Sequence, residues 1–159
     1  DEGGNKVFRL KGADPNLNFW VGGRFSGTSG SDVPLGITES NASKVWFNVD
    51  VRSNVSGISA SEPHKAKLVF EVYDAVAERN TKNWEMDFDV TWTTWKTISI
   101  RADKFHRWNG TGFDVFSGNI TKAWVVALYL TGGSTTVYDF SFDNVQFSQG
   151  APLGQEINP

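Results

Sequence analysis

Apolar side chains alternate with polar ones along several short stretches of the chain, most regularly in residues 45–52. Because successive side chains of a β-strand point to opposite faces, this alternation predicts a strand with one face in a core. The apolar row consists of Val45, Phe47, Val49 and Val51. The opposite row consists of Trp46, Asn48, Asp50 and Arg52, which places an aromatic ring beside an amide, a carboxylate and a guanidinium.

Similar alternation predicts further strands, and helical periodicity is almost absent. The expected strands cover residues 6–11, 18–25, 44–52, 65–74, 84–92, 95–101, 121–130 and 136–147. The expected loops cover residues 27–41, 53–64 and 103–119. About eight short strands separated by turn-rich loops are typical of an all-β fold. We therefore expect a two-sheet antiparallel β-sandwich of the jelly-roll type.

The chain has 159 residues, which suits one domain. We expect that domain to cover residues 1–150 and a C-terminal tail to cover residues 151–159. No apolar run approaches the roughly 18 residues that would predict a membrane-spanning helix. The net charge of −3, without a basic cluster, disfavours a nucleic-acid partner. The sequence contains no cysteine, which excludes disulfides and cysteine-based metal sites.

The polar row that includes Trp46 is the leading candidate for a binding surface. An aromatic ring can stack on the C–H face of a sugar, while carboxylate, amide and guanidinium groups form directed hydrogen bonds with its hydroxyls. The sequence thus favours a carbohydrate ligand and predicts that the Trp46 indole faces water when no ligand is bound. An ordinary solvated face is the competing interpretation for the polar residues, and Trp46 would then cover an edge of the sandwich. The predicted ligand-binding residues are Trp20, Trp46, Asn48, Asp50, Arg52, Glu71 and Tyr73.

Several motifs resemble those of jelly-roll carbohydrate-binding modules. Residues 95–101 and 120–130 precede a terminal strand, residues 138–147, that ends in Asp-Asn-Val-Gln-Phe. Together with residues 7–12 and 19–23, these segments resemble the C-terminal glycan-binding domain of the Bacteroidetes surface glycan-binding lipoproteins. The resemblance implies non-catalytic binding of a polysaccharide, such as a β-glucan or another plant or algal glycan, at an extracellular or outer-membrane surface.

The resemblance also implies the roles of individual residues. Trp20 and Trp46 correspond to the aromatic platforms on which sugar rings stack. From the residue pattern rather than the resemblance, the strand face with Ala127 and Tyr129 suits a shallow groove, which makes Tyr129 a weaker candidate for the site. The region of Asp143 can hold a structural calcium ion in such modules, although we expect no cofactor to be required. We expect a monomer that does not insert into a membrane.

Two alternatives stay open. Glu85, Asp87 and Asp89 alternate onto one strand face, and glycosidases use paired carboxylates. This run also resembles the Glu-x-Asp-x-x-Glu strand of retaining jelly-roll β-glucanases, but it lacks the terminal glutamate, so we do not expect an enzyme. A purely structural spacer is the third possibility. His64 and His106 lie in expected loops without metal-ligand spacing, and we expect both at the surface.

Overall fold

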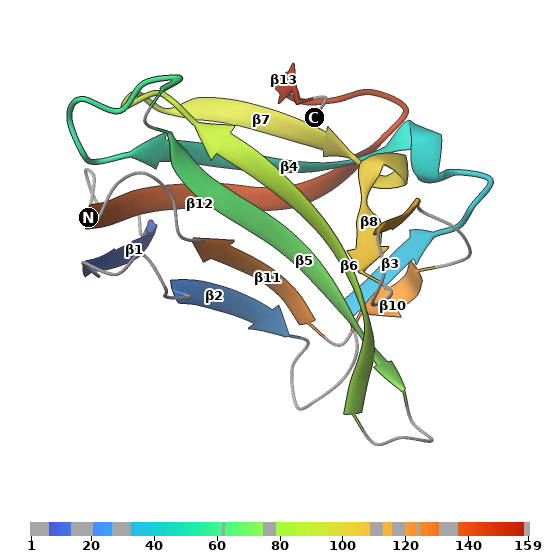
Figure 1. Ribbon diagram of the computed structural model, residues 1–159. Coiled ribbons are helices and arrows are strands. Elements are labelled where there is room, and N and C mark those ends of the chain that lie inside the picture. The colour runs from blue at the N-terminus through green and yellow to red at the C-terminus, as the bar shows by residue number, and fades with distance from the viewer. Residues whose placement is uncertain are drawn as a thin grey trace.

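The computed structural model describes residues 7–13, 21–26, 33–61, 63–74, 79–108, 113–115, 120–123, 125–130 and 137–157. Side chains are described for residues 7–12, 37–61, 63–68, 84–106 and 139–157. In these regions the chain forms an all-β sandwich of two mainly antiparallel sheets (Figure 1). The predicted fold class is confirmed. No helix in the described ranges is long and apolar enough to cross a membrane.

One sheet joins strands from the two ends and the middle of the chain. Its order is β1 (Phe8–Ala13), β12 (Val137–Gln149), β4 (Val45–Ser53), β7 (Lys96–Arg101) and β13 (Gln155–Glu156). Neighbouring strands are antiparallel except β13, which pairs in parallel with β7. We call this the five-stranded sheet.

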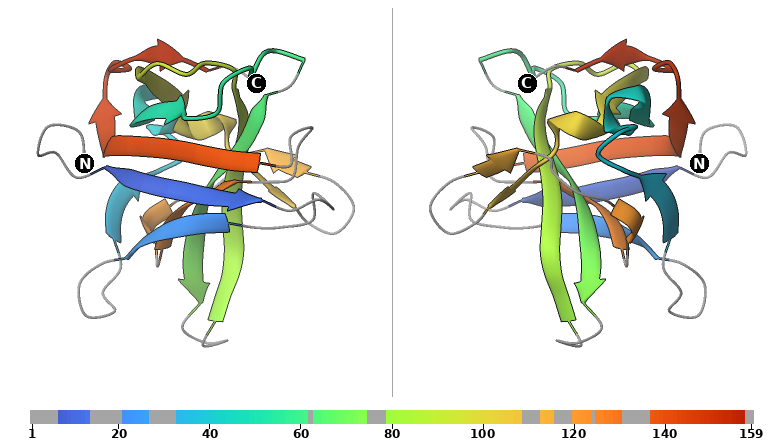
Figure 2. Two further views of the ribbon diagram at one scale, coloured as in Figure 1. Left: turned by 90° about the vertical axis from the view of Figure 1, so that its left-hand side faces the viewer. Right: turned by 90° about the vertical axis from the view of Figure 1, so that its right-hand side faces the viewer.

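The second sheet has the order β2 (Val21–Ser26), β11 (Val125–Leu130), β5 (His64–Asp74), β6 (Arg79–Val90), β8 (His106–Trp108) and β9 (Phe113–Val115). We call this the six-stranded sheet. Figure 2 shows β12 of the five-stranded sheet running across the long β5 and β6 strands. A separate small sheet pairs β3 (Val33–Ile37) with β10 (Ile120–Ala123). Two short 3-10 helices, η2 (Ala42–Lys44) and η3 (Ala102–Lys104), lie close to each other beside the five-stranded sheet.

The core is made by the apolar rows that the alternation predicts. On β4 the row that begins at Val45 is buried, and on β6 the in-phase residues Met86, Phe88 and Val90 are buried as well. Large aromatic side chains fill much of the space between the sheets, among them Phe47, Phe105, Phe140 and Phe142. Because each such side chain contributes about 1.5–3 kcal/mol when it is fully buried, these rows fix the phase of the strands.

His64 departs from its prediction, since its side chain is fully buried rather than at the surface. It is the first residue of β5 and lies in phase with the buried residues Ala66 and Leu68. Its Nδ1 atom is 3.0 Å from the Ser53 hydroxyl oxygen. The expectation was wrong because β5 begins one residue earlier than the sequence pattern indicates, which turns His64 into a core position.

The C-terminal residues cross the outer face of the five-stranded sheet instead of forming a tail. The Gly150 amide donates to the Lys44 carbonyl, and the Leu153 amide donates to Asn48 Oδ1. Figure 1 shows the segment reaching the edge of the sheet beside β7, where β13 pairs. A Cβ atom at Gly154 would lie 2.2 Å from the Thr97 carbonyl oxygen, so only glycine fits this approach. We call residues 150–157 the C-terminal segment.

Candidate functional site

The first predicted site residue, Trp46, does not face water. It lies off the inner apolar row, as its phase predicts, but only 7% of it is exposed. Its cross-strand neighbour Ser148 donates to the Ala151 carbonyl, so the C-terminal segment lies over this part of the sheet. Within the described residues, the buried indole Nε1 has no hydrogen-bond partner. The expected open aromatic platform is therefore wrong, because a later segment of the chain covers it.

Asn48 is fully buried on the same outer face and connects two strands to the C-terminal segment. Its Nδ2 donates to Ser148 Oγ at 3.0 Å, while its Oδ1 accepts from Ser99 Oγ at 2.6 Å and from the Leu153 amide at 3.2 Å. These hydrogen bonds engage both the nitrogen and the oxygen of the Asn48 side-chain amide within the protein. In this arrangement Asn48 cannot reach a ligand, contrary to its prediction.

Asp50 and Arg52 lie on the uncovered part of the face, and the protein itself engages both side chains. Asp50 accepts from Thr97 Oγ1 at 2.5 Å and from Asn144 Nδ2 at 2.7 Å. The Arg52 guanidinium lies over the Trp95 ring, 4.8 Å from its centroid. These two predicted residues are close to each other but belong to a surface without the expected Trp46 platform.

Glu71 and Tyr73 lie on β5, which belongs to the six-stranded sheet, whereas β4 belongs to the five-stranded sheet. The single site expected from the sequence is therefore divided between the two sheets. Alternation gives the phase of each strand but not the sheet that it joins, which explains the error. The backbone register places Glu71 opposite Val125 and Asn83. Trp20 lies outside the described residues, and its predicted role stays a prediction.

The solvent face of the six-stranded sheet carries a different group of polar side chains. It consists of Lys65, Lys67, Glu85, Asp87, Asp89 and His106, and we call it the β5–β6 charged surface. Lys67 Nζ is 3.0 Å from Glu85 Oε1 and 3.7 Å from Asp87 Oδ1. His106 Nε2 is 4.0 Å from the same Glu85 oxygen. Acidic and basic groups thus alternate across neighbouring strands.

The central pair of this surface is recessed. The side chains of Lys67 and Glu85 are only 13% and 17% exposed, whereas Asp87 is 57% exposed. Long charged side chains are usually exposed on a solvent-facing sheet surface, so this pair lies below its surroundings. The register places Tyr129 of β11 opposite Lys67, and Gly22 of β2 opposite Tyr129.

An open sheet edge adjoins the recess. β6 pairs with β8 only through Glu85 and His106, so in the described part of the chain the following residues of β6 pair with β5 on one side and with no strand on the other. A pocket of about 310 Å³ lies there, lined by Lys65, Asp87, Phe88, Asp89 and Ile157. The alternation of Lys65 and Lys67 with buried residues could have indicated this face from sequence. Its ion pairs depend on strand register, which the sequence did not predict.

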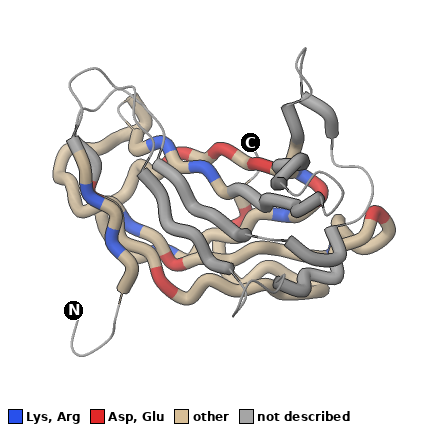
Figure 3. The backbone as a smooth tube through the Cα atoms, turned by 90° about the horizontal axis from the view of Figure 1, so that it is seen from below, with Lys and Arg blue, Asp and Glu red and all other residues tan. Residues whose placement is uncertain are grey.

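Charges of both signs are interspersed along the described strands, as Figure 3 shows. The prediction of a calcium ion near Asp143 is untested. The Asp143 carboxylate accepts from the following amide, that of Asn144, where φ is 50°. Among the described residues, no group of three or more histidine, cysteine or acidic side chains could hold a metal ion.

Acid is expected to destabilise the domain partly through Asp139. Arg9 donates to this carboxylate through Nε at 2.6 Å and through Nη2, and Asn54 donates at 2.9 Å. The Arg9 hydrogen bonds lower the pKa of Asp139 below its ordinary 3.8, although desolvation opposes them. A lowered folded-state pKa adds stability above the unfolded-state pKa, and this stability disappears as the pH falls through the folded value.

Urea unfolding at a series of pH values measures this contribution. The free-energy difference between the wild type and Asp139→Asn should be constant near neutral pH and should shrink from about pH 4 downward. A difference that does not change with pH would show that the ion pair contributes nothing through titration.

Comparisons with known proteins identify the fold. No family model and no curated protein matches the chain. A family 30 carbohydrate-binding module matches with a TM-score of 0.56 at 13% identity, covering 92% of this chain and 78% of that one. The family 11 module of cellulase Lic26A-Cel5E from Clostridium thermocellum matches with a TM-score of 0.52 at 11% identity, covering 98% and 86%.

An agarase, AgWH50C, also matches, with a TM-score of 0.51 at 10% identity over 92% of this chain. The chain spans only 22% of the length of that agarase. At such identities the likeness concerns the fold, which is the jelly-roll β-sandwich of carbohydrate-binding modules. The predicted resemblance is confirmed at this level, whereas the narrower likeness to Bacteroidetes surface proteins stays a prediction.

Proposed function

We propose that this domain binds a polysaccharide without cleaving it, through the β5–β6 charged surface. The observation that carries the proposal is the pair Lys67 and Glu85, whose side chains are only 13% and 17% exposed beside the exposed Lys65, Asp87 and Asp89 on the same face. The fold supports it, because modules with this architecture include one solved in complex with a β-1,3-1,4-mixed-linked tetrasaccharide, at a TM-score of 0.52 and 12% identity.

The chemistry of the recess suits sugar hydroxyls. A lysine ammonium offers three donors, and a carboxylate offers acceptors on both oxygens. Hydrogen bonds that involve a charged partner are roughly twice as strong as neutral ones. In a recess they compete with fewer water molecules, so adjacent hydroxyls of one sugar can bridge Lys67 and Glu85. The register places Tyr129 of β11 opposite Lys67, and β8 carries Trp108 two residues after His106. Tyrosine and tryptophan are residue types on which sugar rings stack.

The proposed ligand is a long, neutral plant or algal polysaccharide such as a β-glucan. A shallow face gives modest affinity for one short segment, and repeated contacts along a long chain raise the overall affinity. The terminal Asp-Asn-Val-Gln-Phe motif resembles that of jelly-roll carbohydrate-binding modules. Taken together with residues 7–12 and 19–23, the pattern resembles surface glycan-binding lipoproteins, which supports capture at a bacterial cell surface as the setting.

Glu85→Gln is expected to weaken polysaccharide binding at least tenfold, or about 1.4 kcal/mol. The substitution keeps the shape of the side chain but removes its charge, so the bond to a sugar hydroxyl and the ion pair with Lys67 both weaken. Isothermal titration against a panel of soluble β-glucans, xyloglucan and agar oligosaccharides measures the effect. Asp103→Asn is the matched control, because it removes a carboxylate paired with Arg101 on another part of the surface.

Unchanged affinity in Glu85→Gln, with binding retained, would exclude the β5–β6 charged surface as the site. If Asp103→Asn weakened polysaccharide binding as much as Glu85→Gln does, the loss would be a general effect of charge instead. If the wild type bound none of the polysaccharides in the panel, the interpretation as a purely structural spacer would be favoured.

Hydrolysis is the second candidate function. Glu85 and Asp87 lie on the same face of β6, and a pair of carboxylates is the machinery that glycosidases use. The same titration samples, assayed for new reducing ends, decide between the two functions. Reducing ends that form with the wild type and vanish with Glu85→Gln would identify a hydrolase.

A further inference from the structure

The pocket beside the open edge of β6 is continuous with the recess of Lys67 and Glu85. Asp87 belongs to both, because it lines the pocket and its Oδ1 atom is 3.7 Å from Lys67 Nζ. Asp89 also lines the pocket and lies beyond Asp87 on the same strand. At a rise of about 3.4 Å per residue, Glu85 and Asp89 are about 14 Å apart along β6. A glycan chain that runs along this strand can therefore extend from the recess into the pocket.

Lys65 and Asp89 supply the polar side of the pocket. Lys65 Nζ is 3.1 Å from Asp89 Oδ1, and the two side chains are 48% and 49% exposed. An ammonium has three donors and a carboxylate has two acceptor oxygens, so each group keeps capacity for sugar hydroxyls beyond their mutual contact. An ion pair this exposed adds little stability, so a ligand can rearrange it at small cost.

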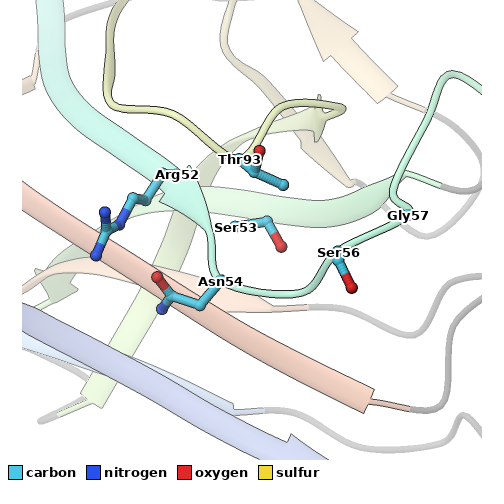
Figure 4. A pocket seen from close by; sticks show the side chains of 6 residues that line it. All are labelled: Arg52, Ser53, Asn54, Ser56, Gly57 and Thr93. Atoms are coloured by element: carbon cyan, nitrogen blue, oxygen red, sulfur yellow. The ribbon is translucent and has the colours of Figure 1, made fainter.

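The pocket at the end of β4 lacks such accessible charges. Its volume is about 400 Å³, and it is lined by Arg52, Ser53, Asn54, Ser56, Gly57 and Thr93 (Figure 4). Figure 4 shows the Arg52 side chain pointing away from Ser56 and Thr93, and its guanidinium lies over the Trp95 ring. The protein itself therefore engages the guanidinium, whereas the pocket beside β6 presents an exposed ion pair.

Ile157 supplies the apolar side of the pocket beside β6. The C-terminal segment brings this residue there, because the Ile157 amide donates to the Ser99 carbonyl at 2.8 Å and β13 pairs with β7 directly before it. The Ile157 side chain packs partly against the core and lines the pocket together with Phe88. A sugar ring presents C–H groups on its faces and hydroxyls around its rim. It therefore matches a pocket that combines an aliphatic side chain with an ion pair.

We propose that this pocket is a second subsite of the polysaccharide site, and that one glycan chain lies along β6 with successive sugar units in the recess and in the pocket. The inference rests on the function proposed for the β5–β6 charged surface and extends it to Lys65, Asp89 and Ile157. A single sugar unit cannot span about 14 Å, so the affinity depends on the length of the glycan.

The charges along this path favour a neutral glycan. Three carboxylates, those of Glu85, Asp87 and Asp89, stand against the two ammonium groups of Lys65 and Lys67. Asp87 is the most exposed of the three carboxylates and lies where the recess and the pocket meet. A uronic acid or a sulfated sugar would place its negative charge beside Asp87, and like charges repel. The two subsites therefore take neutral sugar units.

Titrations with β-1,3-1,4-glucan oligosaccharides of two to six units test the subsite. We expect the affinity of the wild type to rise about tenfold from the disaccharide to the hexasaccharide. Asp89→Asn should lower the hexasaccharide affinity about fivefold. It should leave the disaccharide affinity unchanged, because the disaccharide occupies only the recess. Asp103→Asn is the matched control, since Asp103 is paired with Arg101 of β7, and it should change neither affinity.

Ile157→Ala tests the apolar side of the pocket and should lower the hexasaccharide affinity about threefold. Leu153→Ala is its control, because it removes an aliphatic side chain that is 55% exposed on the same segment and does not line the pocket. This control should bind the hexasaccharide as the wild type does. Thermal unfolding of each variant confirms that it is folded.

An affinity that does not rise with oligosaccharide length would overturn the subsite, as would an unchanged hexasaccharide affinity in Asp89→Asn. Equal hexasaccharide affinities of Ile157→Ala and Leu153→Ala would overturn it as well. None of these results would remove the proposed function, because Glu85→Gln would still weaken binding if the recess alone holds the glycan. Unchanged affinity in Glu85→Gln would exclude the function and the subsite together, and so would failure of the wild type to bind any of the oligosaccharides or the polysaccharide panel.

Discussion

Replacing Trp46 with alanine is expected to lower the free energy of unfolding by about 3–5 kcal/mol and to leave the polysaccharide affinity of the folded protein unchanged. Trp46 is only 7% exposed, although it lies off the inner apolar row of β4. Its removal leaves a cavity that the C-terminal segment, tied to Asn48 and Ser99, cannot readily fill. Urea unfolding measures the loss of stability, and titration below the unfolding transition measures the affinity.

Trp95→Ala is the control for Trp46→Ala. Trp95 is only partly buried, so its removal should cost clearly less stability than that of Trp46. The opposite pattern for Trp46→Ala, an intact unfolding curve with lost polysaccharide binding, would mean that the C-terminal segment moves aside and that the five-stranded sheet holds the glycan after all.

Asn48→Ala is expected to have the second largest effect. The substitution removes the acceptor of the Ser99 hydroxyl and the Leu153 amide, and the donor to Ser148. Each buried polar group left without a partner costs about 1–3 kcal/mol. Some of these groups can find water once the segment loosens, so we expect a total loss of about 2–4 kcal/mol.

Hydrogen exchange distinguishes this effect from a general loss of stability. The amides of Leu153 and Gly154 should exchange much faster in Asn48→Ala, under conditions where amides in the core strands remain protected. Asn144→Ala is the control, because it removes one exposed amide that donates to Asp50. Equal protection of Leu153 in Asn48→Ala and the wild type would show that this side chain does not hold the segment.

The fold could be predicted from the sequence because the alternation of apolar and polar residues along a strand follows which of its faces is buried. Alternation predicts that the row beginning at Val45 lies in the core, and this row is buried. Strands with fewer apolar positions escaped detection: β3, β8 and β9 lie where loops were expected. These three strands have three to five residues, too few for a period of two to stand out.

The site was harder to predict because it depends on contacts between distant residues. The common face of Glu85, Asp87 and Asp89 followed from alternation and agrees with their exposure relative to the buried residues between them. Their pairing with Lys65 and Lys67 requires the register of β5 against β6, which no local pattern specifies. Trp46 was misjudged for a related reason, since the residues that cover it lie about 100 positions later in the chain.

The role of the C-terminal segment has a practical consequence for shortening the protein. A chain that ended at Gln149 would lose β13, the Leu153 amide and the cover over Trp46. The edge of β7 would then expose unpaired backbone groups beside an uncovered indole, and such edges pair with strands of other molecules. Truncation at residue 149 is therefore expected to convert a stable domain into one that self-associates, so Ile157 is the earliest sensible place to end it.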